Sequence, residues 1–298
     1  MKTSPRVQCA FVLAAALALL APRASAQAGK PAATKSGFVT SADGAEIHYI
    51  EEGKGSAILF VPGWTAPGWM WEKQIAHFAE THRVVAMDPR SQGESSQTAE
   101  GLYPAARARD IKAVVDQLKL APVVLVGWSM GAAEVAAYVD QFSTGTLAGL
   151  VFVDGYAGTD YDPNTLSNMF HWVPSFQRDR RKWTEDFVHS NFLFKKPQPE
   201  EYLKRMTQAM LETPTNSAMA IWLGYFVSDF RPALAKIDKP ALIVAAAQGP
   251  FVSMCQDMQK HIRGSRMEVL ENVGHGLFVD DPERFNSLLE NFISGLAH

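Results

Sequence analysis

The amino-acid sequence predicts an α/β protein built on a mostly parallel sheet with helices on both faces. Short apolar runs, typical of strands buried on both sides, alternate along the chain with amphipathic runs typical of helices. This alternation breaks off near residue 155 and resumes after residue 240. Strands that alternate with helices imply right-handed crossovers and parallel neighbours. The expected core therefore comprises residues 37–155 and 237–298, with an insertion over 156–236.

The individual elements follow from where these runs begin and end. Residues 57–61 form a continuous apolar run that Pro62-Gly63 ends, as expected of a strand buried on both faces. The stretch 105–120 has apolar residues at helical spacing along one face. The other expected strands are 45–50, 83–87, 122–126, 150–153, 241–246 and 266–270. The other expected helices are 69–80, 130–141, 253–262 and 282–293.

Residues 1–26 contain the three parts of a secretory signal peptide in order. Lys2 and Arg6 supply a positive start, residues 11–20 an unbroken apolar run, and residues 24–26 an A-x-A cleavage site. The apolar run is too short to span a bilayer of about 30 Å as a helix, which disfavours the alternative of an uncleaved anchor. We therefore expect an exported protein, periplasmic or secreted, without stable membrane insertion.

Composition limits the partners of the exported chain. The 298-residue chain is 47% hydrophobic and 20% charged, which excludes a disordered or fibrous protein. Three of the 28 basic residues lie in the signal peptide, which leaves 25 against 31 acidic residues and a net charge of −6. This charge disfavours nucleic acid or an anionic membrane as the main partner. Residues 27–36 are small and polar and predict a flexible leader, and only Cys255 remains after cleavage, so we expect no internal disulfide.

The insertion at 156–236 is rich in aromatic residues and contains no clean buried strand. It holds 14 of the 31 aromatic residues of the chain. One interpretation is a helical subdomain that packs on itself, and the other is a lid whose inner face lines a pocket. In the second case the expected substrate-binding residues are Trp172, Phe176 and Trp222, together with Trp128 beside the motif described next.

The segment Gly127-Trp-Ser-Met-Gly131 fits G-x-S-x-G between an expected strand and an expected helix. A serine on so tight a turn has strained backbone angles, and the glycines avoid collisions of a Cβ with the neighbouring strand or helix. The turn presents the hydroxyl at a helix N-terminus, where negative charge is favoured. Ser129 is therefore the expected nucleophile.

With this motif the chain resembles the α/β-hydrolase family over nearly all of its mature length. The turn is similar to those of cofactor-free haloperoxidases and small carboxylesterases, and residues 87–95 resemble the D-x-R-G-x-G-x-S turn of the family. The resemblance implies the α/β-hydrolase fold with a helical lid inserted after the sixth strand, and loop-fixing roles for Asp88 and Arg90. No metal-ligand spacing and no phosphate-binding glycine loop is visible, so no cofactor is expected.

A serine nucleophile needs a base, and His275 is the expected one. It lies between two glycines, after an expected strand and before the last expected helix. The family's histidine falls in the same place, in a G-H-x motif ahead of D-x-P-x-x-F. Asp281, before Pro282, is better interpreted as the N-cap of the last helix than as a catalytic acid.

The acid that orients the histidine is less well defined. In most of the family it follows the strand after the lid, but Gly249 and Pro250 occupy that position here. Asp154, at the end of the strand that follows the Ser129 helix, is the preferred candidate, as in some lipases and haloalkane dehalogenases of this fold. Asp257 and a dyad without an acid remain as alternatives.

Two backbone amides must stabilise the oxyanion of an acyl-transfer reaction. One is expected from Met130, after the nucleophile, and the other from Trp64, in the loop after the strand 57–61. The family begins that loop with histidine, whereas this chain has Pro62, so the bonds that fix the loop must differ.

These residues predict hydrolysis of a hydrophobic small-molecule ester, or a lactone, through an acyl-enzyme. A serine at the turn disfavours epoxide hydrolase and dehalogenase chemistry, which use aspartate there. The alternatives are a peptidase similar to proline iminopeptidases, a C–C bond hydrolase, and a slow-turnover binding or sensor protein of the same fold.

Overall fold

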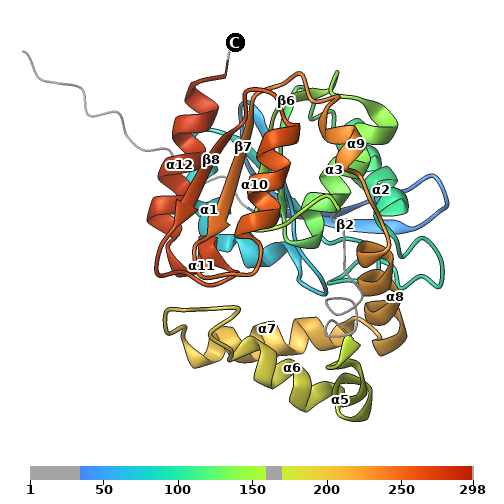
Figure 1. Ribbon diagram of the computed structural model, residues 1–298. Helices are drawn as coiled ribbons and strands as arrows, with labels where there is room; N and C mark the ends of the chain where they lie inside the picture. The colour runs from blue at the N-terminus through green and yellow to red at the C-terminus, as the bar shows by residue number, and fades with distance from the viewer. Residues whose placement is uncertain (1–33, 159–169, 297–298) are drawn as a thin grey trace, which may run out of the picture. The chain divides into compact units, whose positions relative to one another are not determined.

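The computed structural model describes residues 34–158 and 170–296, which form an eight-stranded sheet covered by helices (Figure 1). The strand order is β1-β2-β4-β3-β5-β6-β7-β8. β2 is antiparallel to both of its neighbours, and the remaining pairs are parallel. The strands are β1 (Lys35–Thr40), β2 (Glu46–Gly53), β3 (Ala57–Val61), β4 (Arg83–Met87), β5 (Val123–Trp128), β6 (Leu147–Val153), β7 (Ala241–Ala246) and β8 (Arg266–Leu270). The mostly parallel sheet expected from the sequence is confirmed.

Two groups of helices cover the two faces of the sheet, because successive strand residues point to opposite sides. Leu59 and Leu125 belong to an apolar cluster with residues of α2 (Pro104–Gln117), α3 (Met130–Phe142) and α10 (Val252–His261). Their neighbours Ile58 and Val124 belong to a second cluster with residues of α1 (Glu72–Phe78), α11 (Leu277–Asp280) and α12 (Pro282–Ser294). Helices on both faces are therefore also confirmed.

The parallel register brings the carboxyl ends of three neighbouring strands, β3, β5 and β6, together at one end of the sheet, which we call the carboxyl edge. Val61 pairs with Gly127, and Trp128 pairs with Val153. The loop after β3, the turn after β5 and the loop after β6 therefore leave the sheet side by side. This edge is where ligands bind in α/β sheets.

The helices between β6 and β7 form a separate layer over this edge (Figure 1). They are α5 (Val173–Arg178), α6 (Arg180–Val188), α7 (Glu200–Glu212) and α8 (Thr215–Phe226), which we call the cap, followed by α9 (Arg231–Leu234) on α3. Met206 and Met210 of α7 are buried in the same apolar cluster as Phe60 of β3. Apolar side chains of the cap therefore pack against apolar side chains of the core.

Some expected boundaries were wrong at the N-terminal side of the fold. The expected leader over 27–36 is too long, because Lys35 and Ser36 already lie in β1. β1 is an edge strand that is mostly exposed and pairs only with β2, so it lacks the apolar pattern by which the other strands were found. The expected helix over 69–80 is a 3₁₀ turn (Gly68–Trp71) followed by the shorter α1.

The expected signal peptide, residues 1–26, lies outside the described residues, as do residues 27–33 of the expected leader. None of the helices within 34–158 and 170–296 combines the length and apolar character needed to cross a membrane.

At the other end of the chain, the Asp281 side chain accepts a hydrogen bond from the amide of Arg284 and so caps α12, as its place before Pro282 predicts.

Candidate active site

Ser129 occupies the sharp turn between β5 and α3. Its backbone angles, φ 56° and ψ −121°, lie outside the regions that residues with a Cβ normally adopt. A Cβ on Gly127 would lie 2.4 Å from the carbonyl oxygen of Gly131, and one on Gly131 would lie 2.6 Å from that of Val61. The glycines therefore allow strand, turn and helix to approach closely, and the turn holds Ser129 Oγ clear of the backbone.

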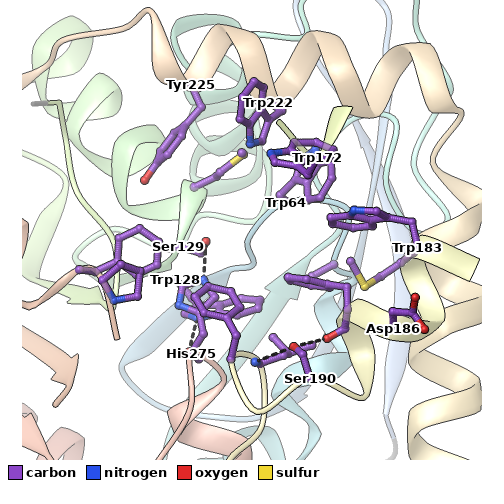
Figure 2. Close-up of a pocket in the computed structure, with 18 of the residues that line it drawn as sticks. Trp64, Trp128, Ser129, Trp172, Trp183, Asp186, Ser190, Trp222, Tyr225 and His275 are labelled. Carbon is purple, nitrogen blue, oxygen red and sulfur yellow. Dashed lines mark hydrogen bonds between the residues drawn. The ribbon is translucent and has the colours of Figure 1, made fainter. Parts of the chain in front are cut away.

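His275 lies directly opposite this serine (Figure 2). Its Nε2 is 2.8 Å from Ser129 Oγ. Its backbone is fixed on both sides, because Trp128 Nε1 donates to its carbonyl oxygen at 2.8 Å and its amide donates to the carbonyl of Phe192 at 2.7 Å. The rings of Phe192 and Phe251 lie 5.0 Å and 4.9 Å from the imidazole centroid. The imidazole is thus held in one orientation, with Nε2 aimed at the serine.

Asp154 completes the hydrogen-bonded row. Its Oδ2 is 2.7 Å from His275 Nδ1, and its Oδ1 accepts from the amide of Ala246 at 2.9 Å. Asp257, the other candidate acid, lies on α10 with a half-exposed side chain 3.6 Å from His261. The structure therefore brings Asp154 and not Asp257 to the imidazole. The end of β7, where most of the resembling family carries its acid, here supplies the Ala246 amide that fixes Asp154.

Two backbone amides flank Ser129 where an oxyanion would form. Among the described residues, the amides of Trp64 and Met130 donate no hydrogen bond. The loop that carries Trp64 approaches the turn so closely that a Cβ on Gly63 would lie 2.8 Å from Ser129 Cβ. Thr65 turns the loop away with a positive φ of 55°. Both candidate donors are thus free to bind a negatively charged oxygen on the substrate.

The side chain of Trp64 extends into the cap. Its Nε1 donates to the carbonyl of Ala218 in α8 at 2.7 Å. Its ring centroid lies 5.7 Å from those of Trp172 and Trp183 and 5.6 Å from that of Phe176. The loop that carries the expected oxyanion donor is therefore bound to the cap as well as to the core.

A cavity of about 840 Å³ lies above Ser129, between the core and the cap (Figure 2). Trp128, Trp172 and Trp222, three of the four expected substrate-binding residues, line it. Aromatic and sulfur-containing side chains form most of the remaining wall. These are Trp64, Met130, Trp183, Phe187, Phe192, Met206, Met210, Tyr225, Phe226 and Phe251.

Phe176, the fourth expected substrate-binding residue, does not line this cavity. It is fully buried behind Trp64, and the guanidinium of Arg180 lies 4.3 Å from its ring centroid. Burial lowers the pKa of that guanidinium to about 10. The sequence could not separate Phe176 from the lining residues, because an aromatic side chain one layer behind the wall is as apolar as one in the wall. Phe251, which does line the cavity, was missed because it follows β7 outside the aromatic insertion.

Cys255 lies beneath the acid but is not a competing nucleophile. Its Sγ donates to the carbonyl of Gly155 at 3.3 Å, and the side chain is fully buried. Burial, together with the nearby Asp154 carboxylate, raises the pKa of the thiol to about 12. The reactive thiolate is therefore absent at neutral pH.

The turn after β4 has the loop-fixing contacts expected of it. Asp88 accepts hydrogen bonds from the amides of Gly68 at 2.5 Å and Glu94 at 2.9 Å, and Arg90 donates two to Asp110 at 2.6 Å.

Within the described part of the chain, no group of three or more His, Cys, Asp or Glu side chains is placed to hold a metal ion.

Comparison with known proteins places this geometry in a family. A family model described as alpha/beta hydrolase fold matches residues 56–282, a span that includes Ser129, Asp154 and His275. A non-heme haloperoxidase from Rhodococcus erythropolis is 28% identical over 270 residues, which cover 86% of this chain and 98% of the relative. A bifunctional esterase/perhydrolase from Acinetobacter calcoaceticus is 28% identical, with coverage of 86% and 99%. An esterase structure from Exiguobacterium antarcticum superposes with a TM-score of 0.81 at 26% identity and covers 87% of this chain and 99% of that one.

Proposed function

Because this chain belongs to the α/β-hydrolase family, we propose that it is a serine hydrolase that cleaves carboxylic esters through an acyl-enzyme. The observation that carries the proposal is the hydrogen-bonded row from Ser129 Oγ through both ring nitrogens of His275 to Asp154. This is the arrangement that a serine needs in order to lose its proton at neutral pH. Relatives and similar structures named as esterases support the ester class.

In the first half of the proposed reaction, Ser129 Oγ attacks the carbonyl carbon while His275 Nε2 takes the hydroxyl proton. Asp154 accepts a hydrogen bond from His275 Nδ1–H and stabilises the imidazolium. The carbonyl oxygen gains the negative charge and is held by the amides of Trp64 and Met130. The ester C–O bond then breaks, and His275 gives its proton to the departing alcohol.

In the second half, water takes the place of the alcohol. His275 removes a proton from the water as its oxygen attacks the acyl carbon, and the same two amides hold the oxyanion again. The bond between the acyl carbon and Ser129 Oγ breaks, and Oγ regains a proton from the imidazolium. The products are one carboxylic acid and the unmodified enzyme.

The cavity wall favours a hydrophobic acyl or aryl ester, or a lactone. Most of the lining side chains are apolar, and three tryptophans, Trp64, Trp172 and Trp222, face the space above Ser129. Apolar walls with a few convergent polar groups are typical of small-molecule sites, and about 840 Å³ lies within their usual range of about 300–1,000 Å³. We therefore place the hydrophobic part of the substrate among these rings.

The peptidase alternative needs cap carboxylates that face the cavity and bind a free amino terminus. Among the described cap carboxylates only Asp186 lines the cavity, and it pairs with Lys182 at 2.9 Å. Two further carboxylates of the insertion, Asp160 and Asp162, lie outside the described residues. The ester proposal therefore has the stronger support.

We also propose that the protein is exported. The support is the sequence of residues 1–26, with its positive start, apolar run and A-x-A site. Mass spectrometry of the protein secreted or released from the periplasm is expected to give a chain that begins at Gln27. A chain that retains residues 1–26 would contradict export by cleavage.

The proposed activity is tested with p-nitrophenyl esters of increasing acyl length. We expect kcat/KM to rise from acetate to an optimum at about four to eight carbons and then to fall as the acyl chain outgrows the cavity. Absence of turnover by folded protein on every ester would overturn the ester proposal. Aminoacyl p-nitroanilides would then separate a peptidase from a C–C bond hydrolase or a binding protein.

A further inference from the structure

The oxyanion loop, residues 62–66, is held by a side chain that belongs neither to the row Ser129–His275–Asp154 nor to the cavity wall. Gln92 lies in the turn after β4 and is fully buried. Its Nε2 donates to the carbonyl oxygens of Gly63 at 2.9 Å and Ala66 at 2.8 Å. These two residues bracket Trp64 and Thr65, so a single amide group fixes both sides of the segment that carries the expected oxyanion donor.

The orientation of Gln92 is set by what lies on its other side. Its Oε1 accepts from Arg107 Nη2 at 2.7 Å, and Arg107 Nη1 lies 3.1 Å from Glu134 Oε1. Arg107 and Glu134 are both buried. Burial raises the pKa of Glu134 to about 7, against the opposing effect of Arg107. A donor on one side and two carbonyl acceptors on the other leave Gln92 only one amide orientation.

This polar chain ends on the helix that carries the second donor. Glu134 lies on α3, whose first residue is Met130. The chain from Gly63 and Ala66 through Gln92 and Arg107 to Glu134 therefore connects the loop of one oxyanion donor to the helix of the other. Pro62 has no side-chain hydrogen-bonding group, so the loop depends on bonds from neighbouring segments such as these.

We propose that Gln92 is a positioning residue that sets the place of the Trp64 amide relative to the Met130 amide. This inference rests on the proposed acyl-transfer function, because an oxyanion forms only in that chemistry. A hole that is displaced by a fraction of an ångström loses stabilisation of the transition state, whereas binding of the uncharged ester changes little. The signature of the role is therefore a loss in kcat with little change in KM.

Two substitutions separate positioning from general damage. Gln92→Met keeps the side-chain length without hydrogen bonds, and Gln92→Glu keeps the acceptor for Arg107 but cannot donate to the two carbonyls. We expect each to lower kcat by about 10²-fold, with KM within about threefold, since loss of one oxyanion donor costs about 10²- to 10³-fold. The loss should be the same for short and long acyl esters, because the hole binds only the carbonyl oxygen.

The matched control is Gln141→Glu. Gln141 Nε2 also donates to two backbone carbonyls, those of Ala105 and Ala137, and its Oε1 accepts from an arginine, Arg109. It lies at the exposed end of α3, away from the oxyanion loop. We expect wild-type kcat and KM for this variant. Circular dichroism melts of all variants identify any that fail to fold, and Gln92→Met avoids placing a new charge in the core.

A second readout does not depend on ester turnover. Ser129 should displace p-nitrophenolate from a methyl p-nitrophenyl alkylphosphonate, and its proton should pass to His275. The labelling rate constant of both Gln92 variants is expected to fall by a factor similar to that in kcat. Folded Gln92 variants that match wild type within about threefold in both kcat and labelling would overturn the positioning role alone. A wild-type protein that neither hydrolyses esters nor reacts with the phosphonate would overturn the proposed function, and the positioning role with it.

Discussion

Replacement of Ser129 by alanine is expected to lower kcat for a p-nitrophenyl ester by about 10⁴-fold or more. The change removes the Oγ that lies 2.8 Å from His275 Nε2. Cys255, the one cysteine among the described residues, cannot replace it, because its thiol is buried and protonated. Alanine and serine both carry a Cβ, so the strain at φ 56° is the same in both proteins. Initial rates at saturating ester measure the effect.

The control for this substitution is Ser143→Ala. Like Ser129, Ser143 has a positive φ, of 59°, and it is exposed just after the end of α3. Its replacement makes the same chemical change at a comparable backbone conformation, and should leave kcat within about twofold, as surface substitutions generally do. A folded Ser129→Ala protein that retains more than a few per cent of wild-type activity would show that another group is the nucleophile.

The second large effect is expected from Asp154→Asn. The amide oxygen can keep the bond from the Ala246 amide, which leaves the Nδ2 donor facing His275 Nδ1. The imidazole must then carry its proton on Nε2, where it cannot accept the serine proton. We expect kcat to fall by about 10³- to 10⁴-fold with KM nearly unchanged.

Asp257→Asn tests the other candidate acid with the same change of chemical group. Asp257 lies 3.6 Å from His261 on the outer side of α10, so we expect wild-type activity. A large loss in Asp257→Asn together with an active Asp154→Asn would reverse the assignment. Full activity in both would favour a dyad without an acid.

Much of the fold could be predicted because its buried strands have no polar face. β3 and β7 are buried at every position, and the apolar runs 57–61 and 241–246 match their bounds. β1 could not be found in this way, because it is an edge strand held by backbone bonds to β2, and Val39 is its one buried residue. Periodicity detects an apolar pattern, and the sequence of β1, Lys-Ser-Gly-Phe-Val-Thr, has none.

The residues of the candidate site also differ in how far the sequence could predict them. Ser129 and His275 lie in short motifs whose glycines indicate tight turns, so the sequence alone singled out both residues as candidates. Asp154 was one of three options, because its role depends on which strand end reaches the histidine, and that is a property of the assembled sheet. Gln92 had no signal, since its contacts with Gly63 and Arg107 join segments 29 and 15 positions apart. Phe176 was misplaced because composition cannot distinguish a cavity wall from the layer behind it.

The proposed mechanism requires that Ser129 form a covalent bond with the acyl group. Its most direct test is to react the protein with a methyl p-nitrophenyl alkylphosphonate and to locate the adduct by peptide mass spectrometry. We expect one adduct per chain, on Ser129, with release of one p-nitrophenolate and loss of esterase activity in proportion to labelling. An active esterase that resists the reagent, or that is inactivated through an adduct on any other residue, would contradict it.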